Sequence, residues 1–393
     1  MPLNLNNSHT VFVLGAGFSV EKGIPTIAEF MVRMRDAHEW LETNGRNAEA
    51  SAIEKVLQFR LDAAGASDRV SLDLENIEEL FSLAAAKDSA LERDIRLAIS
   101  ATVDFCAVTT PEPKGFLAQV DDVSPPQFAS DFPWTSRPSG VESRQLYESK
   151  LTAYQGFAAV MVGAFSSALP KTTFISFNYD LLLEEALSSL HIPFGYGFLP
   201  KAVAYASGLR QGAGNDQNSA IKLLKLHGSI NWALPGRRGR KLTIFPEYAD
   251  LRQDNLIPTL IPPTWRKDLS GNGAALWKEA VNALTTATRI VIIGFSMPDT
   301  DLHFKYLLAA GLQRNLSLRQ IVFVNPIAGD LKPKLERLLS RNAASDKRLL
   351  PLALTARLFL ATDVGAAKRA DHAYFATIGR VPVHRSLAIF LQP

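Results

Sequence analysis

Five short runs of β-branched and aromatic residues constrain the fold of this 393-residue chain more than any other feature. Most of them end at Gly, Asn or Pro, and patterns typical of helices lie between them. In several runs apolar residues occupy both alternating positions, as expected for strands buried on both faces of a parallel sheet. The runs cover residues 11–14, 172–177, 221–226, 290–293 and 321–324. Strands that alternate with helices in this way predict an α/β fold with a Rossmann-like, doubly wound parallel sheet.

The first two predicted strands are separated by far more chain than one crossover helix needs. From residue 26 to residue 170 the pattern is mainly helical, with apolar residues recurring on one helical face. We therefore expect one domain over residues 1–393. It would contain a helical insertion subdomain at 26–170 and the remainder of the Rossmann-like sheet at 171–393.

Local signals divide this pattern further. Asn76 and Glu79 have the spacing of a capping box, which predicts that a helix starts between them. Six prolines between residues 109 and 138 interrupt every period and predict a long loop. A stretch rich in Gly, Asn, Gln and Ser at 206–220 predicts a second surface loop.

Composition excludes several classes of protein. Hydrophobic residues make up 47% of the chain, which excludes a disordered or collagen-like protein. The 42 Lys and Arg residues against 39 Asp and Glu residues give a net charge of only +3, so we expect no direct nucleic-acid partner. The chain has no apolar run long enough to cross a membrane, so no membrane association is expected.

Cysteine usage and the N-terminus bear on the compartment. Cys106 is the only cysteine, so one chain can form neither a disulfide nor a four-cysteine zinc site. The first residues lack the basic and apolar regions of a secretory signal. We therefore expect a cytoplasmic protein that binds no metal.

The first predicted strand runs directly into a glycine-rich turn. Such a turn brings backbone N–H groups close to a pyrophosphate, so a dinucleotide is the first interpretation; a tight strand-to-helix turn is the alternative. Val20 occupies the third glycine position of the dehydrogenase fingerprint, and the acidic candidates Asp36 and Glu39 fall inside a predicted helix. The turn is therefore not typical of an ordinary dehydrogenase. Its sequence is Gly15-Ala16-Gly17-Phe18-Ser19.

Polar motifs follow the other predicted strands in an order that resembles the sirtuins, a family of NAD-dependent enzymes. The set comprises Gly15-Ala16-Gly17-Phe18-Ser19 with Gly23-Ile24-Pro25, then Asn178 with Asp180, then His227-Gly228, then Gly294 with Ser296, and finally Asn325. These motifs span about 310 residues and stand at strand ends, where open α/β sheets bind ligands.

The resemblance implies a role for each of these residues. It makes His227 the general base, which suits an imidazole whose reference pKa is about 6.5, and it makes Asn178 and Asp180 its catalytic partners. It assigns the phosphates to Gly15, Gly17 and Ser19, the adenosine ribose to Gly294, Ser296 and Asn325, and places Ala16, Ile24 and Pro25 in the same NAD-binding set. From the residues alone, structural alternatives remain open. These are a strand-end histidine at His227, a strand-end cap at Asn178, an N-cap at Asp180 for a helix beginning at Leu181, and simple turn glycines.

Two local variants resemble bacterial sirtuin-like effectors of anti-phage defence, which hydrolyse NAD. They are Ser-Phe-Asn-Tyr-Asp at 176–180 and Lys-Leu-His-Gly-Ser-Ile-Asn-Trp at 225–232. Protein-deacylating sirtuins carry four zinc-binding cysteines after the His-Gly motif, whereas no cysteine follows His227 here. The resemblance therefore implies a zinc-free NAD⁺ glycohydrolase that uses NAD as substrate in abortive infection. An NAD-dependent deacylase or ADP-ribosyltransferase, and a sensor that binds NAD or ADP-ribose without turnover, remain alternatives.

The resemblance also implies partners. Short effectors of this type assemble into ring-like homo-oligomers and pair with a separately encoded, HerA-like hexameric ATPase. The predicted sheet and insertion use almost all 393 residues, so control of a toxic hydrolase would have to come from assembly or from such a partner.

Overall fold

The main sheet confirms the predicted fold class. The computed structural model describes residues 9–67, 73–87, 91–112, 152–161, 171–199, 201–210, 212–216, 218–234, 241–261, 272–296, 302–339 and 349–353. An eight-stranded sheet has the order β12-β11-β10-β1-β2-β6-β3-β5, and its neighbouring strands are parallel. The strands are β1 (His9–Leu14), β2 (Lys171–Ser176), β3 (Phe194–Gly195), β5 (Ala213–Gly214), β6 (Ile221–Lys225), β10 (Arg289–Ile293), β11 (Gln320–Val324) and β12 (Leu349–Leu352). The five predicted strands correspond to β1, β2, β6, β10 and β11.

Strand order determines where a ligand can bind. The chain starts in the middle of the sheet with β1, continues outward on one side through β2 and β6, and returns to the other side with β10, β11 and β12. The order therefore reverses between β1 and β10. In doubly wound sheets the loops on the two sides of this switch point diverge and leave a crevice at the carboxyl ends of the strands.

A second, four-stranded sheet was not predicted. Its order is β4-β8-β7-β9, and it comprises β4 (Val203–Tyr205), β7 (Gly228–Ala233), β8 (Leu242–Ile244) and β9 (Pro258–Leu260). The prediction of a plain surface loop at 206–220 is wrong in part, because Ala213 and Gly214 form β5 and pair with β3. Edge strands this short pair through backbone groups alone, so their side chains carry no periodic signal.

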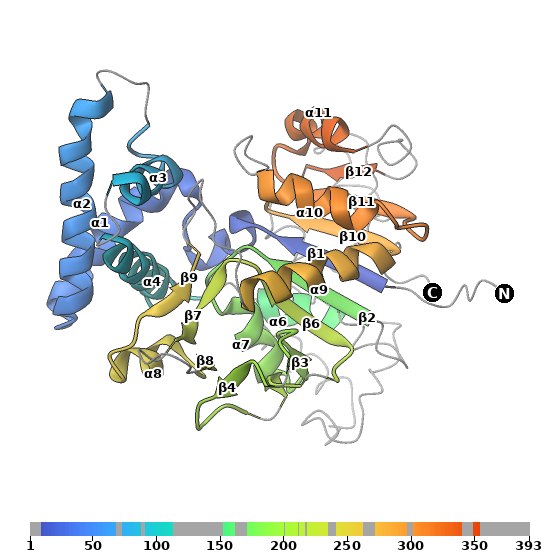
Figure 1. The fold of residues 1–393 in the computed structure, drawn as a ribbon, viewed down its shortest axis with the longest axis horizontal. Coiled ribbons are helices and arrows are strands. Elements are labelled where there is room, and N and C mark those ends of the chain that lie inside the picture. Colours follow the sequence, from blue (N-terminus) through green and yellow to red (C-terminus); the bar gives the residue numbers. More distant parts are fainter. Residues whose placement is uncertain are drawn as a thin grey trace, which may run out of the picture.

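The described part of the chain between β1 and β2 is mainly helical, and helices cover the sheet. Figure 1 shows α1–α4 as a group beside the carboxyl edge of the sheet, α9 in front of the sheet and α6 behind it. Between β1 and β2 lie α1 (Phe30–Thr43), α2 (Asn47–Ser67), α3 (Ile77–Lys87), α4 (Leu91–Thr109) and α6 (Ala153–Met161). After β2 come α7 (Leu182–Ser189), α8 (Tyr248–Gln253), α9 (Asn272–Thr286), α10 (Leu302–Leu312) and α11 (Ala328–Leu338). Among the described residues, no helix combines the length and hydropathy needed to cross a bilayer.

The start of α3 was predicted correctly, but its capping differs in one contact. The helix begins at Ile77, directly after Asn76. The Glu79 carboxylate accepts a hydrogen bond from the backbone N–H of Asp73 at 2.8 Å, three residues before the expected donor at Asn76. The proline-rich loop predicted at 109–138 lies outside the described residues beyond residue 112.

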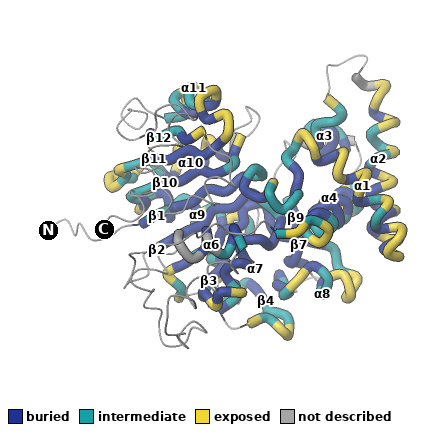
Figure 2. Tube along the Cα trace, turned by 180° about the vertical axis from the view of Figure 1, so that it is seen from behind, coloured by how far each residue is buried: buried dark blue, intermediate teal, exposed yellow. Residues whose placement is uncertain are grey.

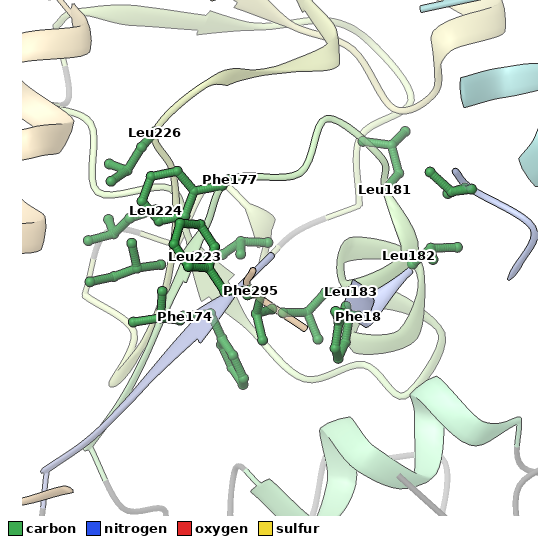
Figure 3. Packing of buried hydrophobic residues seen from close by; sticks show 14 of the residues in the cluster. Phe18, Phe174, Phe177, Leu181, Leu182, Leu183, Leu223, Leu224, Leu226 and Phe295 are labelled. Carbon is green, nitrogen blue, oxygen red and sulfur yellow. The ribbon is translucent and has the colours of Figure 1, made fainter. Parts of the chain in front are cut away.

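The core lies along the central strands. Figure 2 shows these strands as buried, whereas the outer surfaces of α2 and α11 are exposed. Phe12 of β1 stacks on Phe174 of β2 with ring centroids 5.1 Å apart, and Phe157 of α6 meets Phe12 edge to face at 5.8 Å. Figure 3 shows Phe174 among other buried side chains of this core, including Phe18, Phe177 and Leu223. Each fully buried side chain of this size contributes roughly 1.5–3 kcal/mol to stability.

The buried Arg46 joins α2 and α4 of the helical region to α8. The Arg46 guanidinium lies between the rings of Trp40 and Tyr248, 5.3 and 5.7 Å from their centroids. It also forms ion pairs with Glu49 of α2 and Asp104 of α4. The Tyr248 hydroxyl from α8 donates to Glu49 at 2.6 Å. These contacts join α2, α4 and α8 around one charge, which the two carboxylates and two aromatic faces stabilise.

We expect His9 to make stability depend on pH. Its ring nitrogens bond to the hydroxyls of Thr286 and Thr173, and burial together with Lys171 and Lys222 lowers the pKa of His9 from 6.5 to about 4. Between pH 6.5 and 4 the unfolded chain therefore binds a proton that the folded chain does not. The free energy of unfolding should fall as pH drops through this window, by up to about 3 kcal/mol.

Urea unfolding at several pH values, with His9→Asn beside the unchanged chain, measures this effect. The variant should show a shallower loss of stability between pH 7 and 4.5. His38→Asn, at a partly exposed position on α1, is the matched control and should retain the original slope. Equal slopes for all three proteins would contradict the assignment.

Candidate functional site

A cavity of about 940 Å³ lies at the carboxyl edge of the main sheet. Its walls come from the loops after β1, β2, β6, β10 and β11, and from residues of α3 and α4. All twelve residues predicted from the sequence line it: Gly15, Ala16, Gly17, Ser19, Ile24, Pro25, Asn178, Asp180, His227, Gly294, Ser296 and Asn325. A volume near 900 Å³ lies in the usual range for small-molecule and cofactor sites.

The loops after β1 and β10 meet backbone to backbone at the switch point. The Gly17 N–H donates to the Gly294 carbonyl at 2.8 Å, and the Gly15 N–H donates to the Ile293 carbonyl at 3.0 Å. Gly294 has a φ of 63°, and a Cβ at this position would lie 2.3 Å from the Phe18 nitrogen. Only glycine fits this conformation and this approach.

The turn after β1 is tighter than the sequence suggested. Ala16–Phe18 form a short 3₁₀ helix, with N–H donation from Phe18 to the Gly15 carbonyl and from Ser19 to the Ala16 carbonyl. The buried Tyr154 hydroxyl of α6 donates to the Phe18 carbonyl at 3.0 Å and holds the turn from below. Several N–H groups of the turn are therefore bonded within the protein, and their contact with phosphates stays a prediction.

Three predicted residues form one hydrogen-bonded chain. The Asn178 amide donates to the Gly15 carbonyl at 2.9 Å and to the Ser19 hydroxyl at 3.0 Å. The Ser19 hydroxyl in turn donates to Asp180 Oδ2 at 2.7 Å. Ser19 is fully buried. Through these two hydrogen bonds its hydroxyl links the loop after β1 to the loop after β2.

Asp180 also contacts the start of a helix, although the N-cap position of α7 is Leu181 and not Asp180 as the alternative had it. Its Oδ1 atom accepts the N–H of Leu182 at 3.1 Å, the first residue of α7. The helix was predicted to begin at Leu181, one residue too early. The carboxylate thus accepts hydrogen bonds from both α7 and Ser19. A structural role at the start of α7 does not exclude a catalytic role for the same carboxylate.

His227 lies in the two-residue turn between β6 and β7. Gly228 follows it with a φ of 82°, and a Cβ there would lie 2.1 Å from the Thr259 carbonyl oxygen. The imidazole meets the Phe177 ring edge to face, with centroids 5.0 Å apart, and lies 6.2 Å from the Tyr179 ring. These contacts orient the imidazole. His227 is 8% exposed and lines the cavity.

The loops after β10 and β11 form the opposite wall. Asn325 Nδ2 donates to the Phe295 carbonyl at 3.3 Å, and its Oδ1 accepts the Ile327 N–H at 3.0 Å. Ser296 is exposed and lines the same wall. Asn325 therefore joins the two loops, and the contact of these residues with a ribose stays a prediction.

Sequence reasoning missed the wall formed by the helical region. Ile77, Ile99 and Val103 give it an apolar part, while Asp73 and Glu75 lie at its rim. Arg35 and Arg60 of α1 and α2 pair with Glu75. Of the described residues that line the cavity, all the charged ones are carboxylates, namely Glu21, Glu29, Asp73, Glu75 and Asp180. The clustering of Asp73, Glu75 and Asn76 directly before a predicted helix was the available signal.

A buried ion pair behind the cavity was also missed. Lys225 at the end of β6 pairs with Glu184 of α7 at 2.8 Å, and their side chains are 1% and 9% exposed. Burial raises the pKa of Glu184, and the Lys225 ammonium acts in the opposite direction. A lysine that ends an apolar strand directly before Leu-His-Gly was the signal.

Metal ligands do not gather at this site. Within the part of the chain that the structure describes, no group of three His, Cys, Asp or Glu side chains is arranged to hold a metal. Cys106 lies buried in α4, where desolvation raises the pKa of its thiol to about 11. The expected absence of zinc continues to rest on the cysteine count.

Comparison with a protein family supports part of the resemblance. Residues 172–343 match the family model described as "SIR2-like domain". The match covers β2 to α11 and includes Asn178, Asp180, His227, Gly294 and Asn325. It supports a sirtuin-like domain in this part of the chain. A comparison with curated proteins finds no match.

Solved Sir2 structures align along most of the chain at low identity. A crystal structure of Sir2 with the inhibitor EX-527, 2′-O-acetyl-ADP-ribose and a deacetylated p53 peptide is 13% identical, with a TM-score of 0.33, and the alignment covers 92% of this chain and 91% of that one. A mutant Sir2 homologue with 2′-O-acetyl-ADP-ribose is 15% identical with a TM-score of 0.35, at 90% coverage of both chains. Such scores carry no argument, so the fold assignment rests on the strand order.

The glycine contact at the switch point should be essential for stability. We expect Gly294→Ala to lower the free energy of unfolding by at least about 2 kcal/mol, because alanine at a positive φ costs roughly 1–2 kcal/mol before any clash is counted. Gly65→Ala in α2, where a Cβ would meet nothing within 4 Å, is the matched control. It should be neutral or stabilise by about 0.5–1 kcal/mol. Denaturant unfolding measures both, and a Gly294→Ala protein as stable as the control would refute the contact.

Proposed function

We propose that this protein is an NAD⁺ glycohydrolase that cleaves NAD⁺ to nicotinamide and ADP-ribose. The observation that carries the proposal is the convergence of His227, Asn178 and Asp180 with the glycine turn after β1 on one cavity at the switch point. The family match to a SIR2-like domain over residues 172–343 supports it. The described residues offer an imidazole, an amide and a carboxylate in the lining of one cavity, which suits acid–base chemistry on a sugar.

The reaction replaces one bond at the ribose carbon. The bond to nicotinamide breaks and its electron pair leaves with the ring, which becomes neutral nicotinamide. A water oxygen forms the new bond to the same carbon, and His227 accepts the proton that the water loses. Asn178 orients the water or a ribose hydroxyl without adding charge. For this its amide must give up one of its present acceptors, the Gly15 carbonyl or the Ser19 hydroxyl.

The charges around the cavity favour this step. The ribose acquires positive charge as nicotinamide leaves, and Asp180 adds a fixed negative charge to the same cavity. Electrostatic groups that are already in place stabilise such a transition state more than its ground state. Glu75 contributes less, because Arg35 and Arg60 pair with it.

The proposal extends to biological role and control. It places the hydrolase in the cytoplasm, in abortive infection against phage, with activity controlled by a ring-like homo-oligomer or by a HerA-like hexameric ATPase. This part rests on the resemblance of the motifs at 176–180 and 225–232 to defence effectors. The test is to measure the mass in solution across protein concentrations, for the protein alone and for the protein co-expressed with the product of the neighbouring gene. A constitutively active monomer would contradict it.

Removing either central polar residue should abolish most turnover. We expect His227→Ala and Asn178→Ala to fold normally and to release nicotinamide from NAD⁺ ~10²–10⁴-fold more slowly, the usual effect of losing an acid–base group. His38→Ala on α1 controls for the loss of a histidine and should match the unchanged protein. Near-normal rates in both site variants would refute the assignment. If NAD⁺ raises the melting temperature but nicotinamide never accumulates, either alone or with the co-expressed product of the neighbouring gene, the protein is a sensor. A labelled acceptor product would indicate transfer or deacylation.

Asp180→Asn separates the contact with α7 from the charge. An asparagine retains a carbonyl oxygen for the Leu182 N–H, so α7 keeps this contact, but the negative charge is lost. We expect kcat to fall by about 10²-fold or more, in line with the loss of one electrostatic stabiliser. The free energy of unfolding should fall by about 1–3 kcal/mol, because the buried Ser19 hydroxyl loses its acceptor. Steady-state kinetics and urea unfolding measure the two effects. If the variant retains full kcat, the residue has only a structural role.

A further inference from the structure

Lys225 is among the largest fully buried side chains of the described residues, and it does not line the cavity. It ends β6, two residues before His227, and is 1% exposed. Its Nζ atom donates to the Glu184 carboxylate at 2.8 Å, to the Tyr179 carbonyl at 3.3 Å and to the Asp180 carbonyl. Three acceptors match the three N–H groups of an ammonium, so the buried charge is fully satisfied.

Lys225 thereby joins the two loops that carry the proposed chemistry. The Tyr179 carbonyl also accepts the Ile230 N–H at 3.1 Å, and the Leu226 N–H donates to the Ser176 carbonyl at 2.9 Å. The chain before the His227 turn is thus bonded to the end of β2, and the chain after it is bonded to the loop that follows β2. Lys225 is the only one of these links made by a charge, among those that the structure describes.

Glu184 keeps the lysine in place. It lies in the first turn of α7, whose first N–H bonds to Asp180, and its Oε1 also accepts the Tyr196 hydroxyl at 3.4 Å. Burying such a pair is costly, and well-packed apolar residues often replace one without loss of stability. This costly pair lies next to the loop that carries Asn178 and Asp180, and its lysine ends the strand that leads to His227. Its position indicates that the pair fixes the relative placement of these two segments.

We infer that Lys225 is a positioning residue, which holds the loop at 177–181 and the His227 turn at the separation that turnover requires. The inference rests on the proposed hydrolase for its kinetic consequence, and neither Lys225 nor Glu184 lines the cavity. Loss of the pair should therefore change kcat more than KM. A displacement of about 1 Å in a reacting group can cost roughly 100-fold in rate.

The test uses a double variant, because Lys225→Met alone would leave Glu184 buried without its partner. Lys225→Met/Glu184→Gln removes both charges and retains much of the volume. The matched control is Lys222→Met/Glu279→Gln, which removes an ion pair of 2.7 Å from the same strand at a partly exposed position. Each full-length protein is assayed for nicotinamide release from NAD⁺ and for amide hydrogen exchange over 226–230.

We expect the Lys225/Glu184 variant to lose about 10- to 100-fold in kcat, with KM for NAD⁺ within about threefold and faster exchange at 226–230. The control should keep its kcat and its exchange at 226–230. A kcat within twofold of the unchanged protein, or unchanged exchange, would overturn the inference. If the unchanged protein releases no nicotinamide, either alone or with the co-expressed product of the neighbouring gene, the proposed hydrolase fails separately. The exchange result then decides the positioning role by itself.

Discussion

The carboxyl ends of β1 and β10 approach each other more closely than side chains allow, and the cavity depends on that approach. The Gly17 N–H meets the Gly294 carbonyl at 2.8 Å, and a Cβ at Gly15, Gly17 or Gly294 would fall within 3 Å of the facing backbone. Closing the switch point in this way makes a floor of backbone atoms. The proposed ligand would contact these main-chain groups, while the loops on both sides supply polar side chains to the cavity lining.

The polar groups above this floor each serve two purposes. Ser19 joins Asn178 to Asp180, and Asp180 accepts the first N–H of α7. Lys225 bonds the carbonyl of the same aspartate and reaches Glu184 in the first turn of that helix. Stability and proposed chemistry therefore share one hydrogen-bonded network. Because deletions in such a network are not additive, a substitution separates the two only when kinetics and unfolding are measured on the same variant.

The sequence was sufficient to predict the strands that are buried on both faces. A short, uninterrupted apolar run such as 290–293 is typical of a strand in the middle of a parallel sheet. It was also sufficient for the polar residues at their ends, since parallel strands bring those ends to one edge. It failed for β3 and β5, which are two residues long and pair through backbone alone. It failed for Ile99 and Val103 in the cavity wall, because a helical face does not reveal what it packs against.

The wall built by the helical region completes what the sheet cannot supply. An open sheet exposes a ligand at its carboxyl edge to solvent, whereas hydrolysis of a glycosidic bond requires one oriented water and few others. Ile77, Ile99 and Val103 provide an apolar cover over the polar edge that carries His227. The cover is held on its outer side by Arg35 and Arg60 through Glu75, and on the side of the second sheet by Arg46 through Tyr248. In the proposed hydrolase, the apolar side chains of this wall would strengthen the field of Asp180 at the ribose, while the carboxylate of Glu75 is compensated by its two arginines.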